Sequence, residues 1–521
     1  MSLLTLAGLT IQYGDDVVVD DVSFEIAPGE SLGLVGESGS GKTQTALSIL
    51  GLLPAAATVA GSIQLHDQEL MGASEAQLNA VRGGKIAMVF QDPAQALNPY
   101  RTLGAQFRHI VETHVQVFGA EADERIVAMF ERVGLPRPAQ QLHAYPHELS
   151  GGMRQRAMIA AALITKPAML IADEPTTALD VTIQAQILDL LDTVREDTAL
   201  LFISHDLGVV ASCCERTLVM ADGRVVELGP TRTVFTSPQR DETRALIAAS
   251  PRLDATVSLP APDDEILLSI EDVSVRYAQH SGEPVIAVEN GQATLRRGET
   301  VAIVGESGSG KTSLARAILG LVPLHSGRIV FCGDELDRRM QARDLSTRRD
   351  LQLVFQDPAG SLNPHHHVAQ LIGEPLHVHE PNLSADRQQQ RIHNVLLDVG
   401  LDDSFLDRRP HQLSGGQAQR VAIARALVLA PQVLICDEAV AALDNTVQQQ
   451  ILELLRDVQA KTGLSIVFIS HDLAVVCAIS HRVVVMQNGQ QVEAGDTATV
   501  FTAPTHPYTE ALLAAVPTLN V

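Results

Sequence analysis

An eight-residue stretch that occurs twice, letter for letter, constrains this chain more than any other feature. Gly36-Glu-Ser-Gly-Ser-Gly-Lys-Thr43 recurs as Gly305-Glu-Ser-Gly-Ser-Gly-Lys-Thr312. Both copies fit the pattern G-x-x-x-x-G-K-[ST]. In this pattern backbone N–H groups cradle phosphate oxygens, the lysine reaches the β and γ phosphates, and the hydroxyl holds Mg²⁺. Each copy follows an apolar run and precedes a helical pattern, so the sequence predicts two sites for an ATP-like nucleotide.

Most other recognisable segments repeat at nearly the same distance along the chain. Gln91 is answered by Gln356, and Asp173 by Asp437, each about 265 residues later. A constant offset over half the chain indicates a duplicated domain. We expect a first domain at residues 1–251 and a second at residues 266–521. Between them, residues 252–265 carry two prolines and an acidic end, which is typical of a short exposed linker.

Strand and helix patterns alternate within each repeat. Short apolar runs predict buried strands, and several of them end at carboxylates or histidines. Ligands of α/β proteins bind at the carboxyl ends of parallel strands, so these endings favour an α/β fold with mainly parallel sheets. The expected strands are Ser31–Val35, Ala168–Ala172, Leu200–Ile203, Thr300–Val304, Gln432–Cys436 and Ser465–Ile469, and the expected helices after the two repeated stretches are Gln44–Leu53 and Ser313–Val322.

Composition narrows the function class. The net charge of −24 opposes binding to nucleic acid backbones, so we expect no nucleic-acid partner. The five cysteines show no C-x-x-C spacing and favour reduced core thiols over a disulfide framework or a zinc site. No apolar run approaches the ~18–20 residues of a membrane helix, and the first residues lack the basic segment of a secretory signal. We therefore expect a protein made and kept in the cytosol, which a membrane partner could recruit.

Two Asp-Glu pairs follow apolar strands in both repeats. Asp173 and Asp437 are placed to hold Mg²⁺, and Glu174 and Glu438 to orient or deprotonate an attacking water. The alternative is surface acids just beyond a strand end. Their repetition at nearly the same offset as the two phosphate-binding stretches (P-loops) favours the functional interpretation.

Ser-Gly-Gly opens a helical pattern in each repeat, at Ser150-Gly151-Gly152 and at Ser414-Gly415-Gly416. A serine N-cap followed by glycines leaves N–H groups that could meet an oxyanion. The alternative is a plain helix cap. The next residue differs, since Met153 stands where the second repeat has Gln417.

Five motifs in the same order in both repeats resemble the ATPase domains of ABC transporters. They are the P-loop, L-S-G-G, strand-Asp-Glu, Leu-Asp (Leu179-Asp180 and Leu443-Asp444) and Ser-His-Asp around His205 and His471. The resemblance covers nearly the whole chain. It implies two tandem P-loop NTPase domains, each a mainly parallel RecA-like core with an antiparallel β subdomain and a helical signature subdomain.

By this resemblance, the two halves of one chain pair head to tail with two ATP molecules between them, rather than forming a homodimer of chains. The P-loop residues implied in ATP binding are Gly36, Ser38, Gly39, Gly41, Lys42, Thr43 and Gln44, and Gly305, Ser307, Gly308, Gly310, Lys311, Thr312 and Ser313. The first site would be closed by Ser414, Gly415, Gly416 and Gln417, and the second by Ser150, Gly151 and Gly152.

The same resemblance implies roles around the phosphates. Mg²⁺ would be held by Thr43, Gln91 and Asp173 and by Thr312, Gln356 and Asp437. The catalytic groups would be Glu174, His205 and Gln91, and Glu438, His471 and Gln356. Tyr13 and Tyr277 resemble the aromatic residue that stacks on adenine, although ordinary strand tyrosines are the alternative. Since both halves keep the lysine, the Asp and the Glu, we expect two hydrolytically competent sites.

The segments Phe90–Pro99 and Phe355–Pro364 resemble the glutamine loops of bacterial peptide and nickel importers, and Thr505-His-Pro-Tyr-Thr509 resembles the C-terminal motif of that subfamily. In the first half, Gln239–Thr243 takes this place and His-Pro-Tyr is lost. The chain resembles the two ATPases of an oligopeptide importer fused into one, as in microcin C and glutathione importers. Such a chain works on the cytoplasmic face of the inner membrane with two permeases and, indirectly, a periplasmic solute-binding protein.

Other interpretations remain at this point. The solute could be nickel, a metallophore or an opine-like compound, and twin ABC domains also occur in soluble ribosome-associated ATPases. The short proline-bearing linker and the acidic charge argue against the ribosomal alternative. His365-His366-His367 and His377-Val-His379 could suggest a metal-binding regulator, but solvated loop histidines explain them better. Because both halves lack a cysteine-rich tail, we predict no iron–sulfur cluster.

Overall fold

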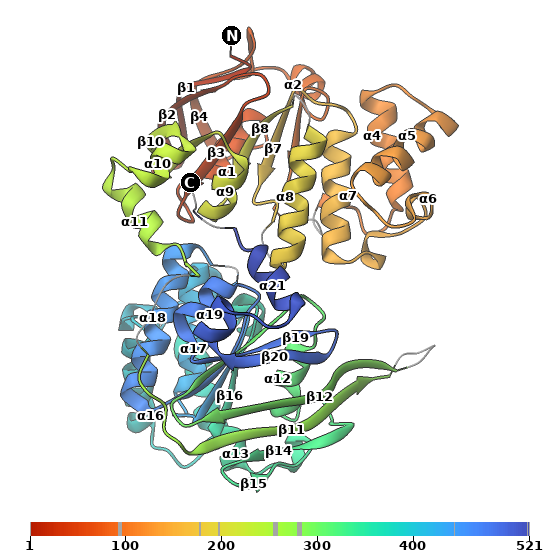
Figure 1. Cartoon of the computed structure of the whole chain (residues 1–521). Helices are drawn as coiled ribbons and strands as arrows, with labels where there is room; N and C mark the ends of the chain where they lie inside the picture. Colours follow the sequence, from red (N-terminus) through yellow and green to blue (C-terminus); the bar gives the residue numbers. More distant parts are fainter. Residues whose placement is uncertain are drawn as a thin grey trace. The chain divides into compact units, whose positions relative to one another are not determined.

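The computed structural model describes residues 2–91, 96–176, 179–195, 198–253, 259–278, 284–441, 443–517 and 519. The chain divides into two compact units (Figure 1). The first comprises Met1–Leu179, Ile183–Ser250 and Pro517–Val521, and the second Asp180–Thr182 and Pro251–Val516. Part of the expected linker, residues 254–258, lies outside the described residues.

A six-stranded, mainly parallel sheet forms the centre of the first unit, in the order β10-β9-β3-β8-β7-β6. Every residue of β3, β7 and β8 is buried, which explains why these strands are continuous apolar runs in the sequence. Only β10 runs antiparallel, against β9. The strands are β3 (Ser31–Gly36), β6 (Ile86–Val89), β7 (Met169–Asp173), β8 (Ala199–Ile203), β9 (Arg216–Ala221) and β10 (Arg224–Pro230).

A second, antiparallel sheet of four strands has the order β2-β1-β4-β5. Its strands are β1 (Leu4–Tyr13), β2 (Asp16–Ile26), β4 (Ala57–Leu65) and β5 (Gln68–Glu69). Buried and exposed residues alternate in much of β1, so one face of this sheet covers the core and the other is solvated. Tyr13 is the last residue of β1 and pairs with Asp16 across a tight hairpin.

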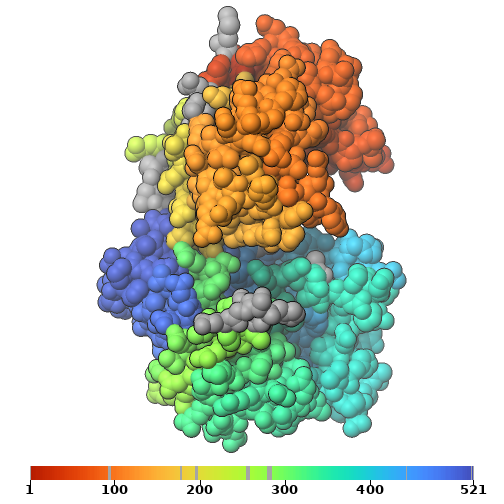
Figure 2. Space-filling model, turned by 90° about the vertical axis from the view of Figure 1, so that its right-hand side faces the viewer, coloured from red at the N-terminus to blue at the C-terminus, as the bar shows by residue number. Residues whose placement is uncertain are grey.

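Helices of the first unit form a separate subdomain and flank the parallel sheet. Phe107 and Phe130 pack edge to face at 4.8 Å in the helical subdomain, which forms much of the orange surface in Figure 2. The helices are α1 (Lys42–Ile49), α2 (Glu75–Val81), α4 (Leu103–His114), α5 (Gly119–Arg132), α6 (Pro138–Gln141), α7 (Gly151–Leu163), α8 (Val181–Arg195), α9 (Leu207–Cys213), α10 (Thr231–Thr236) and α11 (Asp241–Ala249).

The second unit repeats this plan. Its sheets have the orders β16-β17-β18-β13-β19-β20 and β12-β11-β14-β15. The strands are β11 (Ile266–Tyr277), β12 (Val285–Arg296), β13 (Thr300–Val304), β14 (Ser326–Phe331), β15 (Asp334–Glu335), β16 (Leu351–Val354), β17 (Val433–Asp437), β18 (Ser465–Ile469), β19 (Arg482–Gln487) and β20 (Gln490–Asp496).

The helices of the second unit again flank the parallel sheet and build a helical subdomain (Figure 1). They are α12 (Lys311–Ile318), α13 (Leu345–Asp350), α14 (Pro358–Ser361), α15 (Val368–His379), α16 (Ala385–Asp398), α17 (Gly415–Leu427), α18 (Asn445–Thr462), α19 (Leu473–Ile479), α20 (Thr497–Thr502) and α21 (Pro507–Ala514). Within the described ranges, no helix combines the length and the apolar character needed to cross a membrane.

The predicted strands lie within one residue of those observed, but the helices after the P-loops differ at both ends. They begin at the P-loop lysines, two residues earlier than expected, and end at Ile49 and Ile318 instead of Leu53 and Val322. Gly51 (φ 60°) and Gly320 (φ 70°) adopt the left-handed conformation that commonly ends a helix.

Candidate active sites

The P-loop of the first unit connects β3 to α1 and wraps around Lys42. The Nζ of Lys42 donates to the carbonyl oxygens of Gly36 at 2.8 Å and Glu37 at 2.7 Å. Gly36 has φ 155°, and a Cβ there would lie 2.2 Å from the carbonyl oxygen of Met220. The loop therefore requires glycine at this corner, and it holds a buried ammonium at the N-terminus of α1.

The second P-loop, between β13 and α12, has the same geometry. The Nζ of Lys311 donates to the carbonyl oxygens of Gly305 at 2.7 Å and Glu306 at 2.8 Å. A Cβ on Gly305 would lie 2.1 Å from the carbonyl oxygen of Met486. Burial lowers the pKa of Lys311, and nearby carboxylates oppose that shift, with the largest effect from Glu438.

The remaining P-loop glycines are needed for two different reasons. Gly39 (φ 82°) and Gly308 (φ 80°) have open space around a would-be Cβ, so only their left-handed backbone favours glycine. Gly41 and Gly310 precede the helices, and a Cβ on either would lie within 3 Å of a backbone carbonyl oxygen. Ser40 and Ser309 between them are buried.

Each P-loop threonine meets the carboxylate that ends the neighbouring strand. Thr43 Oγ1 donates to Asp173 Oδ1 at 3.3 Å, and Thr312 Oγ1 donates to Asp437 Oδ1 at 3.0 Å. Burial raises the pKa of Asp173 to about 6 and also raises the pKa of Asp437, while the threonine hydrogen bonds partly offset the effect. A buried carboxylate beside a hydroxyl is a pair of oxygen ligands of the kind that Mg²⁺ prefers.

A glutamate joins the glutamine and the histidine in each unit. In the first unit, Gln91 Nε2 donates to Glu174 Oε2 at 2.8 Å, and His205 Nδ1 lies 3.3 Å from Glu174 Oε1. In the second, Gln356 Nε2 donates to Glu438 Oε2 at 2.6 Å, and His471 Nδ1 lies 3.5 Å from Glu438 Oε1. The structure thus brings these predicted residues together twice, from segments far apart in the sequence.

Glu174 raises the pKa of His205 in the first unit, and in the second unit Glu438 and His471 shift one another's pKa. Burial alone would lower the pKa of His205 and His471, but the hydrogen bonds and charges of Glu174 and Glu438 raise both above the ordinary value. In the second unit, burial would raise the pKa of Glu438, yet His471 and then Lys311 lower it. In the second unit the pair therefore favours a charged glutamate beside a histidine that gains a proton more readily than usual.

Both glutamates have a backbone conformation that sequence reasoning did not anticipate. Glu174 (φ 46°) and Glu438 (φ 49°) are left-handed, although neither is glycine. Their N–H groups donate to the carbonyl oxygens of Ile203 at 2.9 Å and Ile469 at 3.0 Å. Left-handed non-glycine residues are uncommon and concentrate at functional sites. Such a residue immediately after a strand carries no sequence signal of its own.

The histidines are positioned by the aspartates that follow them. Asp206 Oδ1 accepts from the N–H groups of Gly208 at 2.9 Å and Val209 at 3.2 Å, which makes it the N-cap of α9. Asp472 caps α19 in the same way. The Asp of the Ser-His-Asp motif is therefore a helix cap, and it fixes the turn that carries the histidine between strand and helix.

Tyr13 and Tyr277 are hydrogen-bonded to the residue after the P-loop threonine. Tyr13 Oη donates to Gln44 Oε1 at 2.7 Å, and Tyr277 Oη contacts Ser313 Oγ at 3.3 Å. Both rings are half-buried at the end of a strand of the antiparallel sheet. These bonds tie that sheet to the P-loop helix, which fits either an adenine-binding or a structural role.

The signature serines cap their helices in both units. Ser150 Oγ accepts from Met153 N–H, and Ser414 Oγ accepts from Gln417 N–H, each at 3.3 Å. Gln417 Oε1 also accepts from the N–H of Ser414 at 3.0 Å, which completes a capping box. Met153 cannot make this second bond, so the Met-for-Gln difference weakens the N-terminus of α7 relative to α17.

The two signature glycines are not equivalent. A Cβ on Gly151 would meet nothing within 4 Å, whereas one on Gly152 would lie 2.9 Å from Ile183 Cγ2. In the second unit, a Cβ on Gly415 would have its nearest neighbour at 3.9 Å, but one on Gly416 would lie 2.4 Å from Val447 Cγ1. The second glycine is thus required for helix packing, and only the first presents open space.

The described residues fit ATP and Mg²⁺. A triphosphate with Mg²⁺ requires backbone N–H groups at glycines, a lysine at a helix N-terminus and oxygen ligands for the ion. The structure supplies P-loop glycines, most of which leave no room for a Cβ, a buried lysine and a Thr–Asp pair of oxygens. In the described part of the chain, no three or more His, Cys, Asp or Glu side chains are grouped to hold a metal. Mg²⁺ needs no such group, since one or two carboxylates and the substrate phosphates suffice.

Comparison with known proteins agrees with this geometry. Residues 19–177 and 288–441, together more than half of the chain, match the family described as ABC transporter, and residues 492–521 match the oligopeptide/dipeptide transporter C-terminal region. The chain is similar to the peptidoglycan transport ATP-binding protein YejF of Agrobacterium fabrum, with 46% identity over 98% of this chain and 96% of the relative.

Two further relatives are similar along almost their full length. An uncharacterized ABC transporter ATP-binding protein YejF of Escherichia coli is 45% identical over 98% of this chain and 99% of the relative. The glutathione import ATP-binding protein GsiA of Escherichia coli is 43% identical over 99% of this chain and 90% of the relative. The family implies permease subunits as partners. The chain belongs to the ABC transporter family, as an ATP-binding subunit with two ATPase domains that hydrolyses ATP to drive transport.

Proposed function

We propose that this chain energises the import of peptides or peptide-like solutes. The observation that carries the proposal is the C-terminal match to the oligopeptide/dipeptide transporter region at residues 492–521. Relatives that transport peptidoglycan and glutathione, by their names, support the same class of solute. The two domains would be residues 1–251 and 266–521, and the chain would work at the cytoplasmic face of the membrane.

Both domains would hydrolyse ATP, because each holds a complete set of charged groups. Lys42 and Lys311 rest on P-loop carbonyls and would turn to the β and γ phosphates. Glu174 and Glu438, which lie beside His205 and His471, would orient the attacking water and accept its proton. Each site would be completed by the signature serine and glycines of the other half of the same chain.

Mg²⁺ would be held by Thr43 and Asp173 in the first domain and by Thr312 and Asp437 in the second, with Gln91 and Gln356 beside them. When bound, the ion neutralises charge on the β and γ phosphates. A cation would also stabilise the charged form of Asp173, whose pKa burial raises.

The surface beside Gln356 suits a permease contact. Leu345, Phe355 and Val378 are large apolar side chains that are 48%, 45% and 58% exposed. His379, next to Val378, contacts the carbonyl oxygen of Leu345 through Nδ1 at 3.3 Å, and this contact joins α15 to α13. Exposed apolar side chains can contribute to a protein–protein contact, and these three are the proposed contribution of this unit.

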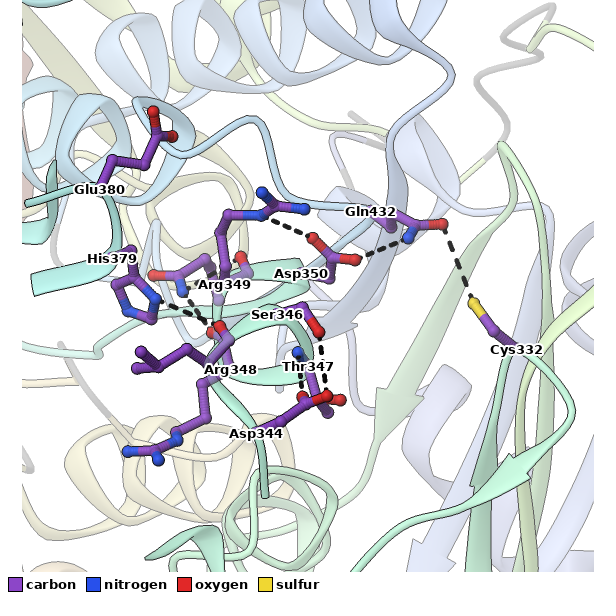
Figure 3. A network of polar contacts seen from close by, with 12 residues as sticks. Cys332, Asp344, Ser346, Thr347, Arg348, Arg349, Asp350, His379, Glu380 and Gln432 are labelled. Carbon is purple, nitrogen blue, oxygen red and sulfur yellow. Dashed lines mark hydrogen bonds and ion pairs between the residues drawn. The ribbon is translucent and has the colours of Figure 1, made fainter. Parts of the chain in front are cut away.

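Strand β16, which ends two residues before Gln356, begins beside a polar network (Figure 3). Asp350 Oδ2 accepts from Gln432 Nε2 at 2.8 Å, and Asp350 Oδ1 accepts from Arg349 Nε at 3.1 Å. These bonds fix the start of β16 against β17, the strand that ends in Asp437. A movement of Gln356, just beyond the carboxyl end of β16, would pass to these exposed apolar side chains and then to a permease, while a periplasmic binding protein would select the solute.

The test uses the full chain with both catalytic glutamates replaced, Glu174→Gln/Glu438→Gln. The tagged variant is purified with ATP and Mg²⁺ from detergent-solubilised membranes, and co-purified proteins are identified by mass spectrometry. The matched control is Lys42→Ala/Lys311→Ala, which cannot hold the triphosphate. We expect two polytopic permeases with the first variant and little or none with the control.

Ribosomal proteins in place of permeases would overturn the transport proposal. If permeases are recovered, a co-purified binding protein is denatured and its released ligand is identified. Peptides support the proposed solute class, whereas nickel, a metallophore or an opine-like compound would replace it.

A further inference from the structure

The C-terminal motif Thr505-His-Pro-Tyr-Thr509 has a defined place in the second unit. It leads from the loop after α20 into the first turn of α21, whose first residue is Pro507. His506 Nδ1 accepts from the N–H of Tyr508 at 3.2 Å and so caps this helix. The motif therefore fixes the direction in which α21 starts and, with it, the place of Tyr508.

Glu493 of β20 anchors the motif from the other side. Its Oε1 accepts from the N–H and the hydroxyl of Thr505, each at 2.8 Å, and its Oε2 accepts from the N–H of His506 at 3.2 Å. Burial would raise the pKa of Glu493, but its hydrogen bonds, those from Thr505 and His506 among them, lower it. A charged carboxylate thus clamps the turn onto the parallel sheet.

This clamp brings the Tyr508 hydroxyl to the P-loop. The N–H of Glu306, the second residue of the P-loop, donates to Tyr508 Oη at 3.0 Å. The carbonyl of the same residue accepts from Lys311 Nζ at 2.8 Å. Tyr508 is only 9% exposed, and burial raises its pKa to about 12, so the hydroxyl stays neutral.

The first unit keeps the clamp and lacks the tyrosine. Glu227 accepts from the N–H groups of Gln239 at 3.0 Å and Arg240 at 3.3 Å, just as Glu493 does in the second unit. The residue that corresponds to Tyr508 is Glu242, which is exposed. The two P-loops, identical in sequence, therefore differ in what supports them.

We propose that Tyr508 is a positioning residue for the second ATP site, which holds the Glu306 peptide in the conformation that receives the triphosphate. The P-loop binds phosphate through backbone N–H groups, so its affinity depends on how well these groups are held before the nucleotide arrives. With the Glu306 N–H fixed by the tyrosine, the following N–H groups stay directed into the loop. The first P-loop has no tyrosine at this position, so Tyr508 acts on the second site alone.

The test removes one oxygen atom. Tyr508→Phe is made in a Lys42→Ala background, so that titration with a fluorescent ATP analogue reports the second P-loop of the full chain. Loss of one hydrogen bond from a half-buried N–H should weaken binding about tenfold. In ATPase assays, the KM for ATP should rise while kcat changes little, because Tyr508 does not touch the reacting atoms.

Two controls separate positioning from a general loss of structure. Tyr508→Phe in a Lys311→Ala background should leave binding at the first P-loop unchanged. Glu242→Ala, at the corresponding position of the first unit, should also leave that binding unchanged. An unchanged affinity of the second P-loop, or equal weakening in both backgrounds, would overturn the proposal. The titration measures nucleotide binding alone, so its outcome is independent of which solute is transported.

Discussion

Asp173 and Asp437 are the residues at which function conflicts most directly with stability. Each is an acid buried at the end of a parallel strand, with a threonine hydroxyl as its hydrogen-bond donor. Burial disfavours the charged form and raises both pKa values. The nucleotide-free protein therefore carries a carboxylate that costs stability at neutral pH, and a cation at the site would relieve that cost.

This conflict predicts that Asp173→Asn stabilises the nucleotide-free protein. Burial raises the pKa of Asp173 from the ordinary 3.8 of an aspartate to about 6. The stabilising contribution of the protonated group is therefore complete below pH 3.8 and is lost as the pH rises through 6. Asparagine has no charge to lose. We expect a gain of up to about 2 kcal/mol at pH 8 that becomes smaller towards pH 5.

The measurement is urea unfolding at pH 5 and pH 8, without nucleotide or Mg²⁺. Asp189→Asn, at an exposed position of α8, is the control for removing one acid. A variant that is less stable than the parent at pH 8 would show that the threonine bond outweighs burial. The same variant should hydrolyse ATP poorly, because it has lost a proposed Mg²⁺ ligand.

At the level of secondary-structure elements, the signature helices show that one motif serves two purposes. The serine caps the helix, the first glycine leaves open space above it, and the second glycine allows close packing against the next helix. From sequence, both glycines were interpreted as a source of free N–H groups. That interpretation stays a prediction, and the structure adds that Gly152 and Gly416 are also needed for close contacts with Ile183 and Val447.

Alanine at the two glycine positions of α17 should therefore affect different properties, stability at Gly416 and ATPase activity at Gly415. Gly416→Ala forces a Cβ to 2.4 Å from Val447 Cγ1 and should cost about 1–3 kcal/mol of unfolding free energy. Gly415→Ala should stay within about 0.5 kcal/mol, since nothing lies closer than 3.9 Å, yet it should lower ATPase activity if this glycine faces nucleotide.

Urea unfolding and steady-state ATPase assays separate the two effects. The matched pair in α7 is Gly152→Ala and Gly151→Ala. The Cβ of Gly152→Ala would lie 2.9 Å from Ile183 Cγ2, so this variant should lose less unfolding free energy than Gly416→Ala. Full ATPase activity in Gly415→Ala and Gly151→Ala would contradict a role for the first glycine at the nucleotide.

At the scale of the whole molecule, the chain holds the same set of proposed catalytic residues twice. Each set contains a P-loop lysine, a Thr–Asp pair and a glutamate between a glutamine and a histidine, with matching contacts in both units. The differences lie around these groups, at Met153 and at Tyr508. Two competent but unequal sites are the expectation for such a chain.

Single and double replacement of the glutamates tests this expectation. Glu174→Gln and Glu438→Gln should each leave partial turnover, while the double variant should lose about 100-fold or more, the usual contribution of a general base. Phosphate release is measured at several protein concentrations, because sites completed within one chain give a rate per chain that does not depend on concentration. Full activity in either single variant would contradict two coupled sites.

The chain's own sequence was sufficient for much of this result. Repeated motifs predicted the duplication, the α/β class and the family, because P-loop binding requires particular residues at fixed spacing. Continuous apolar runs located β3, β7 and β8 and their counterparts to within a residue, since strands buried on both faces tolerate few polar side chains.

Other features were decided only by the tertiary structure. The helices after the P-loops are shorter than expected because Gly51 and Gly320 end them, and the left-handed Glu174 and Glu438 have no local signal. The motif around Tyr508 was visible in the sequence, but its contact with Glu306 joins residues about 200 positions apart. Local spacing determines which residues can bind phosphate. Which distant hydroxyl supports the loop depends on long-range packing, which one sequence without its fold does not specify.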